Sequence, residues 1–177
     1  MEYKQRMYAM VLRQLNPMQK GIQALHAVVE YAQAHFATNY YQQWAKNDKT
    51  MIVLDGGTSI ELADVIKQLD EIDYTYAVFK EPDLYDQVTA IAFLVPETVW
   101  DRETYPDYES YKAKKLEEIN SPSSMNFGNS LLFKSMVNTV VSVDSWVKDV
   151  FHCQMDENIL KTIDDMRNLI FSKKLSQ

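Results

Sequence analysis

Positive charge, cysteine and long apolar runs are all scarce in this sequence of 177 residues, and each scarcity narrows what it can encode. Lys and Arg number 18 against 25 Asp and Glu, so the formal net charge is -7. Non-specific nucleic-acid binding draws much of its affinity from Lys and Arg that neutralise phosphates. A broadly basic nucleic-acid-binding module is therefore disfavoured, whereas a small local basic site is not.

The single cysteine, Cys153, excludes an internal disulfide bond and is typical of a reducing compartment. No apolar run approaches the length of a membrane span, and the charged start lacks the apolar centre of a secretory signal. We therefore expect a cytoplasmic protein with no membrane segment. Its length suits one substantial core, or one domain with an appendage.

Hydrophobic periodicity and turn residues predict alternating strands and helices in the first hundred residues. Strands are expected at 8–15, 51–54, 74–79 and 88–95, with helices at 17–35 and from Thr58 to Ile72. The link between the last two strands is too short for a parallel crossover, so these strands should be antiparallel. We predict an α/β fold, a three-layer domain with a four-stranded mixed sheet in the order β-α-β-α-β-β.

The first predicted helix has two stripes of side chains at three- and four-residue spacing. The apolar stripe is expected to be buried and consists of Ile22, Leu25, Val29, Ala32 and Phe36. The polar stripe should border the core and face a cleft, and it consists of Gln19, Gln23, His26 and Glu30.

Residues 101–177 are predicted to form a helical extension to a domain at 1–100. Helices are expected at 108–119, 131–153 and 157–173, with a Ser-Pro-Ser-Ser breaker at 121–124. They should pack on the domain, on one another or on a second chain, so a protein partner and a homodimer both stay open. Tyr105, Tyr108 and Tyr111, with nearby lysines, would suit stacking on an RNA end. Intervening acidic residues favour an ordinary charged helix instead.

Three segments should meet where the predicted strands end, at the edge where α/β proteins gather ligands. These segments are the helix start at Asn16 to Lys20, the turn at Asp55 to Thr58, and the loop from Lys80 to Asp83. Helix starts there offer free N–H groups and a partial positive charge. A site at this edge is therefore predicted.

The residues after the first strand also resemble a known motif. The run Met18-Gln-Lys-Gly-Ile-Gln-Ala-Leu-His-Ala-Val-Val-Glu30 resembles the first motif of the class II (archaeal and eukaryotic type) peptidyl-tRNA hydrolases. That motif has a Lys-rich turn, then Ala-Ala-Gln, two residues, His-Ala and a helix. The resemblance covers about residues 7–96, leaves the C-terminal half unmatched, and is compatible with a divergent phage-encoded member that works in the host cytoplasm.

The resemblance implies hydrolysis of the ester that joins a peptidyl or N-blocked aminoacyl group to the tRNA 3′ end, without a metal or organic cofactor. This reaction needs a carboxylate that orients or deprotonates water, and a cation or donor for the developing oxyanion. The implied catalytic residues are Lys20, Glu81 and Thr89. The residues implied to bind substrate are Arg13, Asn16, Gln23 and Asp83, with His26 and Glu30 supporting them from behind.

Two positions depart from the family motif. Gln19 aligns with the family's catalytic lysine, which Lys20 replaces only if the turn shifts by one residue. Glu81-Pro-Asp-Leu84 replaces the family's Asp-Ala-Gly-Arg. These departures favour an alternative of another class: a catalytically inactive, phage-encoded relative that binds a protein or RNA partner as a regulator or inhibitor.

Two other site types receive little support. The Gly56-Gly57 pair before a helix invites a nucleotide-binding module, but neither phosphate-binding fingerprint is present, so an ordinary tight turn is favoured. His26 and Glu30 have the spacing of metal ligands, yet no third ligand is apparent, and no metal site is predicted.

Overall fold

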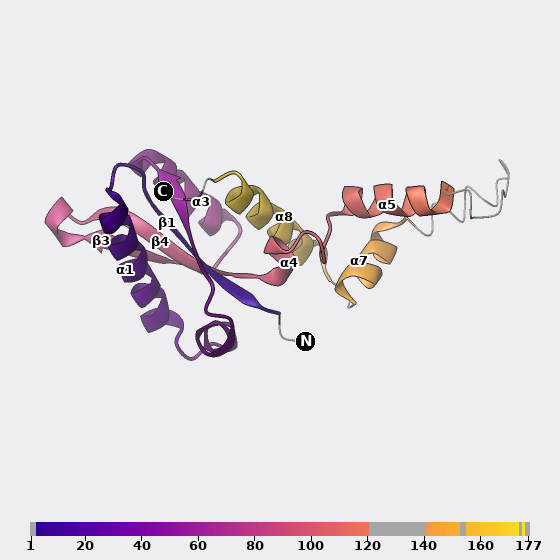
Figure 1. The fold of residues 1–177 in the computed structure, drawn as a ribbon, viewed down its shortest axis with the longest axis horizontal. Helices are drawn as coiled ribbons and strands as arrows, with labels where there is room; N and C mark the ends of the chain where they lie inside the picture. The colour runs from indigo at the N-terminus through magenta and orange to yellow at the C-terminus, as the bar shows by residue number, and fades with distance from the viewer. Residues whose placement is uncertain (1–2, 121–140, 153–154, 174, 176–177) are drawn as a thin grey trace. The chain divides into compact units, whose positions relative to one another are not determined.

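The computed structural model describes residues 3–120, 141–152, 155–173 and 175 (Figure 1). The chain divides into two compact units, and each is described by itself. One unit comprises residues 1–100 with 165–177, and the other comprises residues 101–164. The first unit holds the four strands of the sheet and every residue assigned to the predicted hydrolase site.

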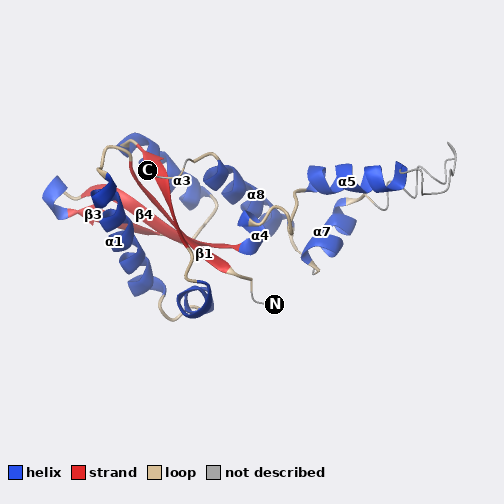
Figure 2. Ribbon diagram, in the orientation of Figure 1, coloured by secondary structure: helices blue, strands red, loops and turns tan. Residues whose placement is uncertain are grey.

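The sheet has four strands in the order β2-β1-β4-β3, coloured red in Figure 2. The strands are β1 (Gln5–Leu12), β2 (Met51–Gly57), β3 (Ala77–Glu81) and β4 (Gln87–Pro96). β1 runs parallel to β2, whereas β4 runs antiparallel to both β1 and β3. The predicted α/β class and four-stranded mixed sheet are therefore confirmed.

Two helices cover opposite faces of this sheet, α1 (Pro17–His35) and α3 (Ser59–Glu71) (Figure 1). A capping box starts α3, because the Thr58 hydroxyl accepts a bond from the Glu61 amide and the Glu61 carboxylate accepts one from the Thr58 amide. Its buried residues are Leu62, Val65 and Leu69. The helix expected from Thr58 to Ile72 is therefore present.

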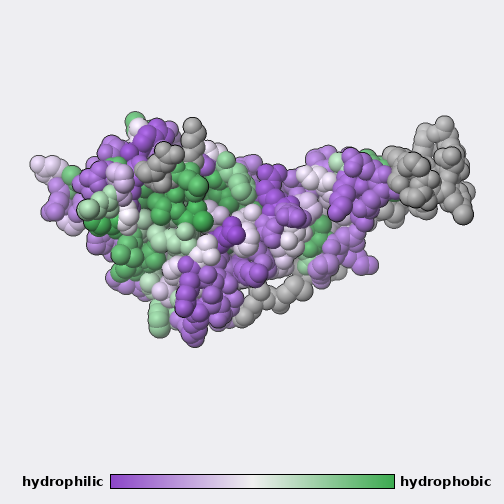
Figure 3. All heavy atoms as spheres, viewed as in Figure 1, coloured by the Kyte–Doolittle hydropathy of each residue, from purple (hydrophilic) through white to green (hydrophobic). Residues whose placement is uncertain are grey.

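The predicted buried stripe of α1 is wrong. Leu25 and Phe36 are 60% and 66% exposed, and Ile22 and Val29 are also exposed. The face turned to the sheet is instead made of Gln23, Ala24, Ala27, Val28 and Tyr31, with the alanines at its centre. Figure 3 shows hydrophobic residues gathered on the surface of the α/β unit in this view.

The packing between α1 and the sheet explains this orientation. Ala24 and Ala27 meet the sheet in one buried cluster with Ala9, Ala90 and Ala92. Methyl side chains on both surfaces let a helix and a sheet pack closely without voids, whereas large side chains there would hold them apart. The sheet under α1 thus selects the small-residue face, and the larger side chains point away from it.

The remaining elements follow the predictions in part. Between α1 and β2 lie the short helix α2 (Asn39–Gln43) and the π-helix η1 (Trp44–Asp48). β1 ends at Leu12 instead of Leu15, since Leu15 donates to the Leu12 carbonyl in a turn that leads into α1. A 3-10 turn, η2 (Pro82–Leu84), joins β3 to β4, and α4 (Glu97–Trp100) follows β4.

The C-terminal helices are α5 (Tyr108–Asn120), α7 (Val143–Phe151) and α8 (Glu157–Phe171). Of the predicted helix at 131–153, residues 131–140 and Cys153 lie outside the described residues, as does the predicted breaker at 121–124. Its described part begins at an N-cap, Ser142. Within the described residues, no helix combines the length and apolar character needed to cross a membrane.

The orientation of α1 is tested by replacing alanine with leucine at two positions of the helix that are seven residues apart. Ala27→Leu should lower the free energy of unfolding by about 1–3 kcal/mol, because Ala27 is fully buried against the sheet. Ala34→Leu, at an exposed position of the same helix, should change it by less than about 0.5 kcal/mol. Chemical denaturation measures both, and equal losses would contradict the packing described.

Candidate functional site

The strand ends form one edge of the sheet, where most of the predicted site residues lie. β1, β2 and β3 all end at this edge, and β4 begins there, because β4 is antiparallel to its two neighbours. The N-termini of α1 and α3 follow directly from β1 and β2. The topology thus brings the three predicted segments to the same edge.

A hydrogen-bonded triplet, Gln23, Glu81 and Thr89, joins three elements at this edge. The Gln23 amide nitrogen donates to Oε2 of Glu81, which ends β3. The Thr89 hydroxyl on β4 donates to the Gln23 amide oxygen at 2.5 Å. The Gln23 amide therefore uses its donor and its acceptor at once, and we call this set the Gln23 triplet.

Burial makes the Gln23 triplet rigid while leaving the carboxylate within reach of solvent. Thr89 is fully buried and Gln23 is 7% exposed, whereas Glu81 is half-buried. The register of β3 and β4 shifts between Phe79 and Lys80, and Thr89 lies opposite this irregularity. A buried amide with both partners in place resists rotation, so it fixes the orientation of the Glu81 carboxylate.

A second cluster surrounds Arg13, which follows β1. The Arg13 guanidinium bonds Asp55 at 2.8 Å and lies 3.7 Å from the Glu61 carboxylate. Asp55 also accepts a hydrogen bond from the Gly57 amide at 2.8 Å. The resemblance implied that Arg13 binds substrate, but its described partners are Asp55 and Glu61.

The charges and hydrogen bonds around Asp55 shift its pKa. Partial burial works to raise this pKa, but the hydrogen bonds from Arg13 and Gly57 and the charges of Arg13 and Lys20 outweigh it. The pKa of Asp55 therefore lies below its ordinary value. The positive charge of Lys20 is one of the causes that lower it.

The predicted meeting of Lys20 and Glu81 in one hollow stays a prediction. Lys20 precedes Gln23 by three residues, so the two side chains leave α1 on the same side of the helix. Gln23 contacts Glu81, whereas the charge of Lys20 acts on Asp55.

The other predicted residues take structural or exposed positions. Asn16 caps α1 and exchanges hydrogen bonds with Gln19, so both side chains close a capping box. His26 stacks on Phe79 with ring centroids 4.5 Å apart. Asp83 lies exposed in the η2 turn, and Glu30 is exposed on α1.

The glycine turn has a structural explanation. Gly57 has a φ of +81°, and a Cβ atom there would lie 2.5 Å from the Glu61 carboxylate. A Cβ at Gly56 would lie 2.9 Å from the Val11 carbonyl oxygen on β1. Both glycines are thus accounted for by the close approach of β2 to β1 and by the cap of α3.

Sequence reasoning missed the acidic partners of Arg13 and the side-chain bond between Gln87 and Ser59. Gln87 begins β4 and donates to the Ser59 hydroxyl of α3 at 2.5 Å. The contact between Arg13 and Asp55 could have been predicted, because an acidic residue directly after a strand lies at the same edge as Arg13. The bond between Gln87 and Ser59 could not, since the position of Gln87 depends on the order of the strands in the sheet.

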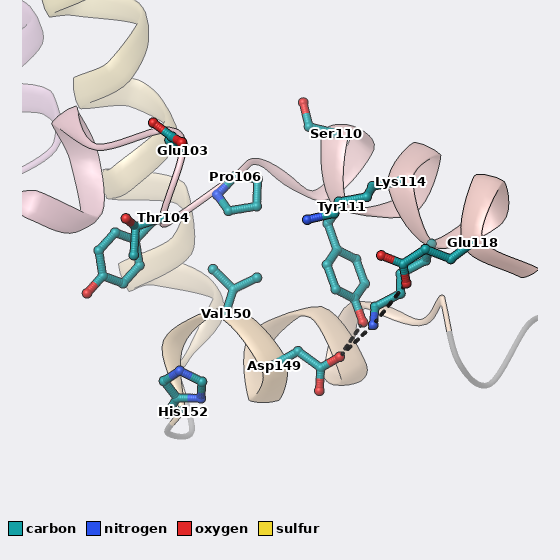
Figure 4. A pocket seen from close by; sticks show the side chains of 12 residues that line it. Glu103, Thr104, Pro106, Ser110, Tyr111, Lys114, Glu118, Asp149, Val150 and His152 are labelled. Atoms are coloured by element: carbon teal, nitrogen blue, oxygen red, sulfur yellow. Dashed lines mark hydrogen bonds and ion pairs between the residues drawn. The ribbon is translucent and has the colours of Figure 1, made fainter.

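A cavity of about 430 Å³ lies within the unit of residues 101–164, between α5 and α7 (Figure 4). The Tyr111 hydroxyl donates to Asp149 at 2.8 Å, and the Lys115 ammonium lies 3.7 Å from the same carboxylate. Tyr111 is 5% exposed, and Tyr105 packs on Phe151. These tyrosine rings therefore serve helix packing, in keeping with the ordinary helix that the sequence favours.

No group of three or more His, Cys, Asp or Glu side chains suited to a metal ion occurs in the described part of the chain. Comparison of the sequence with protein-family models and with curated proteins finds no match. The functional argument therefore rests on the residues at the sheet edge.

The role of the Gln23 amide is tested by Gln23→Glu, which keeps the shape but removes the donor and puts a second carboxylate beside Glu81. We expect the free energy of unfolding at pH 7 to fall by about 1–3 kcal/mol. Gln19→Glu is the matched control on the same helix, because Glu in a capping box accepts the same Asn16 bond. A thermal or denaturant series that shows equal losses would contradict the triplet.

The Arg13–Asp55 pair makes a prediction about pH. Since the folded pKa of Asp55 is below its unfolded value of about 3.9, ionised Asp55 stabilises the fold above that pH, and the contribution is lost as the pH falls through the folded pKa. Arg13→Gln should raise the pKa of Asp55 toward its ordinary value, as measured by carboxyl NMR titration. Arg102→Gln, which removes a guanidinium from Asp107 instead, should leave Asp55 unchanged.

Proposed function

We propose that the protein hydrolyses the acyl ester bond of peptidyl- or N-blocked aminoacyl-tRNA, in the manner of the class II peptidyl-tRNA hydrolases that residues 7–96 resemble. The observation that supports this best is the Gln23 triplet. The resemblance singled out Gln23, Glu81 and Thr89 from three separate parts of the sequence, and hydrogen bonds join these three side chains.

In this proposal the Glu81 carboxylate acts on water. Gln23 occupies one carboxylate oxygen, Oε2, and the other orients or deprotonates the water that attacks the ester carbonyl. Half-burial suits this role, because the carboxylate is fixed by its neighbours and still open to substrate. Thr89 acts through Gln23, whose amide it holds in the orientation that donates to Glu81.

Lys20 supplies the positive charge that the reaction needs. Its ammonium stabilises the oxyanion that develops on the carbonyl, or binds the phosphates next to the 3′ ribose. Arg13 is neutralised by Asp55 and Glu61, which leaves it less suited to bind phosphate. In this scheme the Arg13 cluster therefore shapes the turn, and Lys20 meets the substrate.

One observation favours the second candidate, an inactive relative that binds a protein or RNA partner. Gln19, which aligns with the family's lysine, uses its side chain to cap α1. The position that carries the cation in the family is thus committed to the helix start. In this candidate the protein keeps the fold of the family but does not hydrolyse the ester.

The assay that separates the two candidates incubates the purified protein with N-acetylaminoacyl-tRNA and follows release of the N-acetylamino acid. Glu81→Gln and Lys20→Ala should each lower the rate by about 10²- to 10⁴-fold, the usual contribution of a general base or a charged group at a developing oxyanion.

Lys67→Ala and Glu71→Gln are controls for these two substitutions, since they alter an exposed ion pair on α3. Both control proteins should keep the wild-type rate. If the wild type releases no N-acetylamino acid, the hydrolase function is refuted and the binding function is the remaining candidate. Release that persists in Glu81→Gln would refute the role of the carboxylate.

A further inference from the structure

The turn that joins β3 to β4 has an unfavourable backbone conformation. We use the name β3–β4 turn for residues 81–87, which project beyond the end of β3 (Figure 1). Tyr85 and Asp86 have φ values of +56° and +57°, so two successive residues other than glycine lie in the left-handed region. Bulky side chains rarely adopt this conformation, because the Cβ atom crowds the backbone there. Tyr85 is also 100% exposed, so its ring adds no buried surface to the fold.

Both ends of the β3–β4 turn are tied to helices. Glu81 accepts the hydrogen bond from Gln23 of α1, and Gln87 donates to the Ser59 hydroxyl of α3 at 2.5 Å. The Asp86 amide donates to the Glu81 carbonyl at 3.1 Å, which closes the turn on itself. An unfavourable backbone persists only where its surroundings fix it, and such positions cluster at active sites and ligand clamps. These bonds therefore fix the turn that carries the exposed ring.

The chemistry of the β3–β4 turn selects the part of an RNA that it suits. Glu81, Asp83 and Asp86 place three carboxylates in seven residues that contain no Lys or Arg, so a phosphate group would be repelled. An exposed aromatic ring instead stacks on the unpaired bases of single-stranded nucleic acid, because every base has a flat π face. The turn therefore suits a base and not a phosphate.

We propose that the Tyr85 ring stacks on the last base of the tRNA 3′ end and so holds the ester beside Glu81. This role rests on the proposed function, in which that ester is the bond cleaved. The acyl group is joined to the ribose that also carries the last base, so a residue that binds this base has to lie close to the residue that activates water. The backbone bond between Asp86 and Glu81 keeps Tyr85 in the same closed turn as the carboxylate.

The role of the ring is tested by measuring the binding of deacylated tRNA, which keeps the last base but has no ester to cleave. Tyr85→Gly removes the ring and suits the left-handed backbone, so it should weaken binding about tenfold without lowering the midpoint of thermal unfolding. Tyr85→Phe keeps the ring and should bind as the wild type does. Tyr40→Ala is the matched control and should also bind as the wild type does, because it removes a tyrosine ring that is 67% exposed on α2.

A tRNA without its last nucleotide tests the contact itself. The wild type and Tyr85→Gly should bind this shortened tRNA equally, because the ring has no base on which to stack. In the hydrolysis assay, Tyr85→Gly should raise KM for N-acetylaminoacyl-tRNA about tenfold and leave kcat unchanged, since stacking contributes equally to the bound substrate and to the transition state. A distorted turn would instead lower kcat, because Glu81 begins that turn.

Two results would overturn the stacking role. They are equal binding of deacylated tRNA by the wild type and Tyr85→Gly, or a loss of affinity in Tyr85→Gly that persists with the shortened tRNA. Neither result would affect the hydrolase, provided that the wild type still cleaves the ester.

The proposed function fails by a different result. If Tyr85→Gly loses affinity for deacylated tRNA but the wild type releases no N-acetylamino acid, the ring binds the base and the protein is the RNA-binding candidate. A wild type that neither binds tRNA nor cleaves the ester would overturn both the stacking role and the hydrolase.

Discussion

The docking of α1 on the sheet is the constraint on which the rest of the α/β unit depends. Alanines on both surfaces let the helix approach closely, and this approach buries the Gln23 amide. A buried amide without partners would cost about 1–3 kcal/mol, so the position of the helix and the bonds to Glu81 and Thr89 are mutually dependent. The same contact thus builds the core and orients the carboxylate of the candidate site.

The charges at this edge are balanced by pairs instead of being spread over the surface. Arg13 is held by two acidic side chains of the β2–α3 turn, and the pKa of Asp55 is lowered as a result. A carboxylate with a bonded cation is a poor base, and Asp55 is such a carboxylate. This is the physical reason why the proposed function gives Asp55 a structural role and leaves water activation to Glu81.

Local sequence signals predicted much of this fold, and they failed where tertiary packing decides between two patterns. The helix at 59–71 has one apolar face and a capping box, so its start and its buried side were both predictable. Helix α1 has two stripes of the same period. Hydrophobicity alone selects the stripe with Leu25 and Phe36, but the alanines of β1 and β4 require small partners, and those strands lie elsewhere in the sequence. The Gln23 triplet was predictable only through the resemblance, since its members come from three elements.

The two faces of α1 differ because only one of them can meet the sheet. The Gln23 triplet and the alanines of the sheet hold one face, so the helix cannot rotate to bury Leu25 and Phe36 in the same unit. The bonds that orient the Glu81 carboxylate therefore also fix which face of the helix is buried, and among the described residues the larger apolar side chains stay exposed.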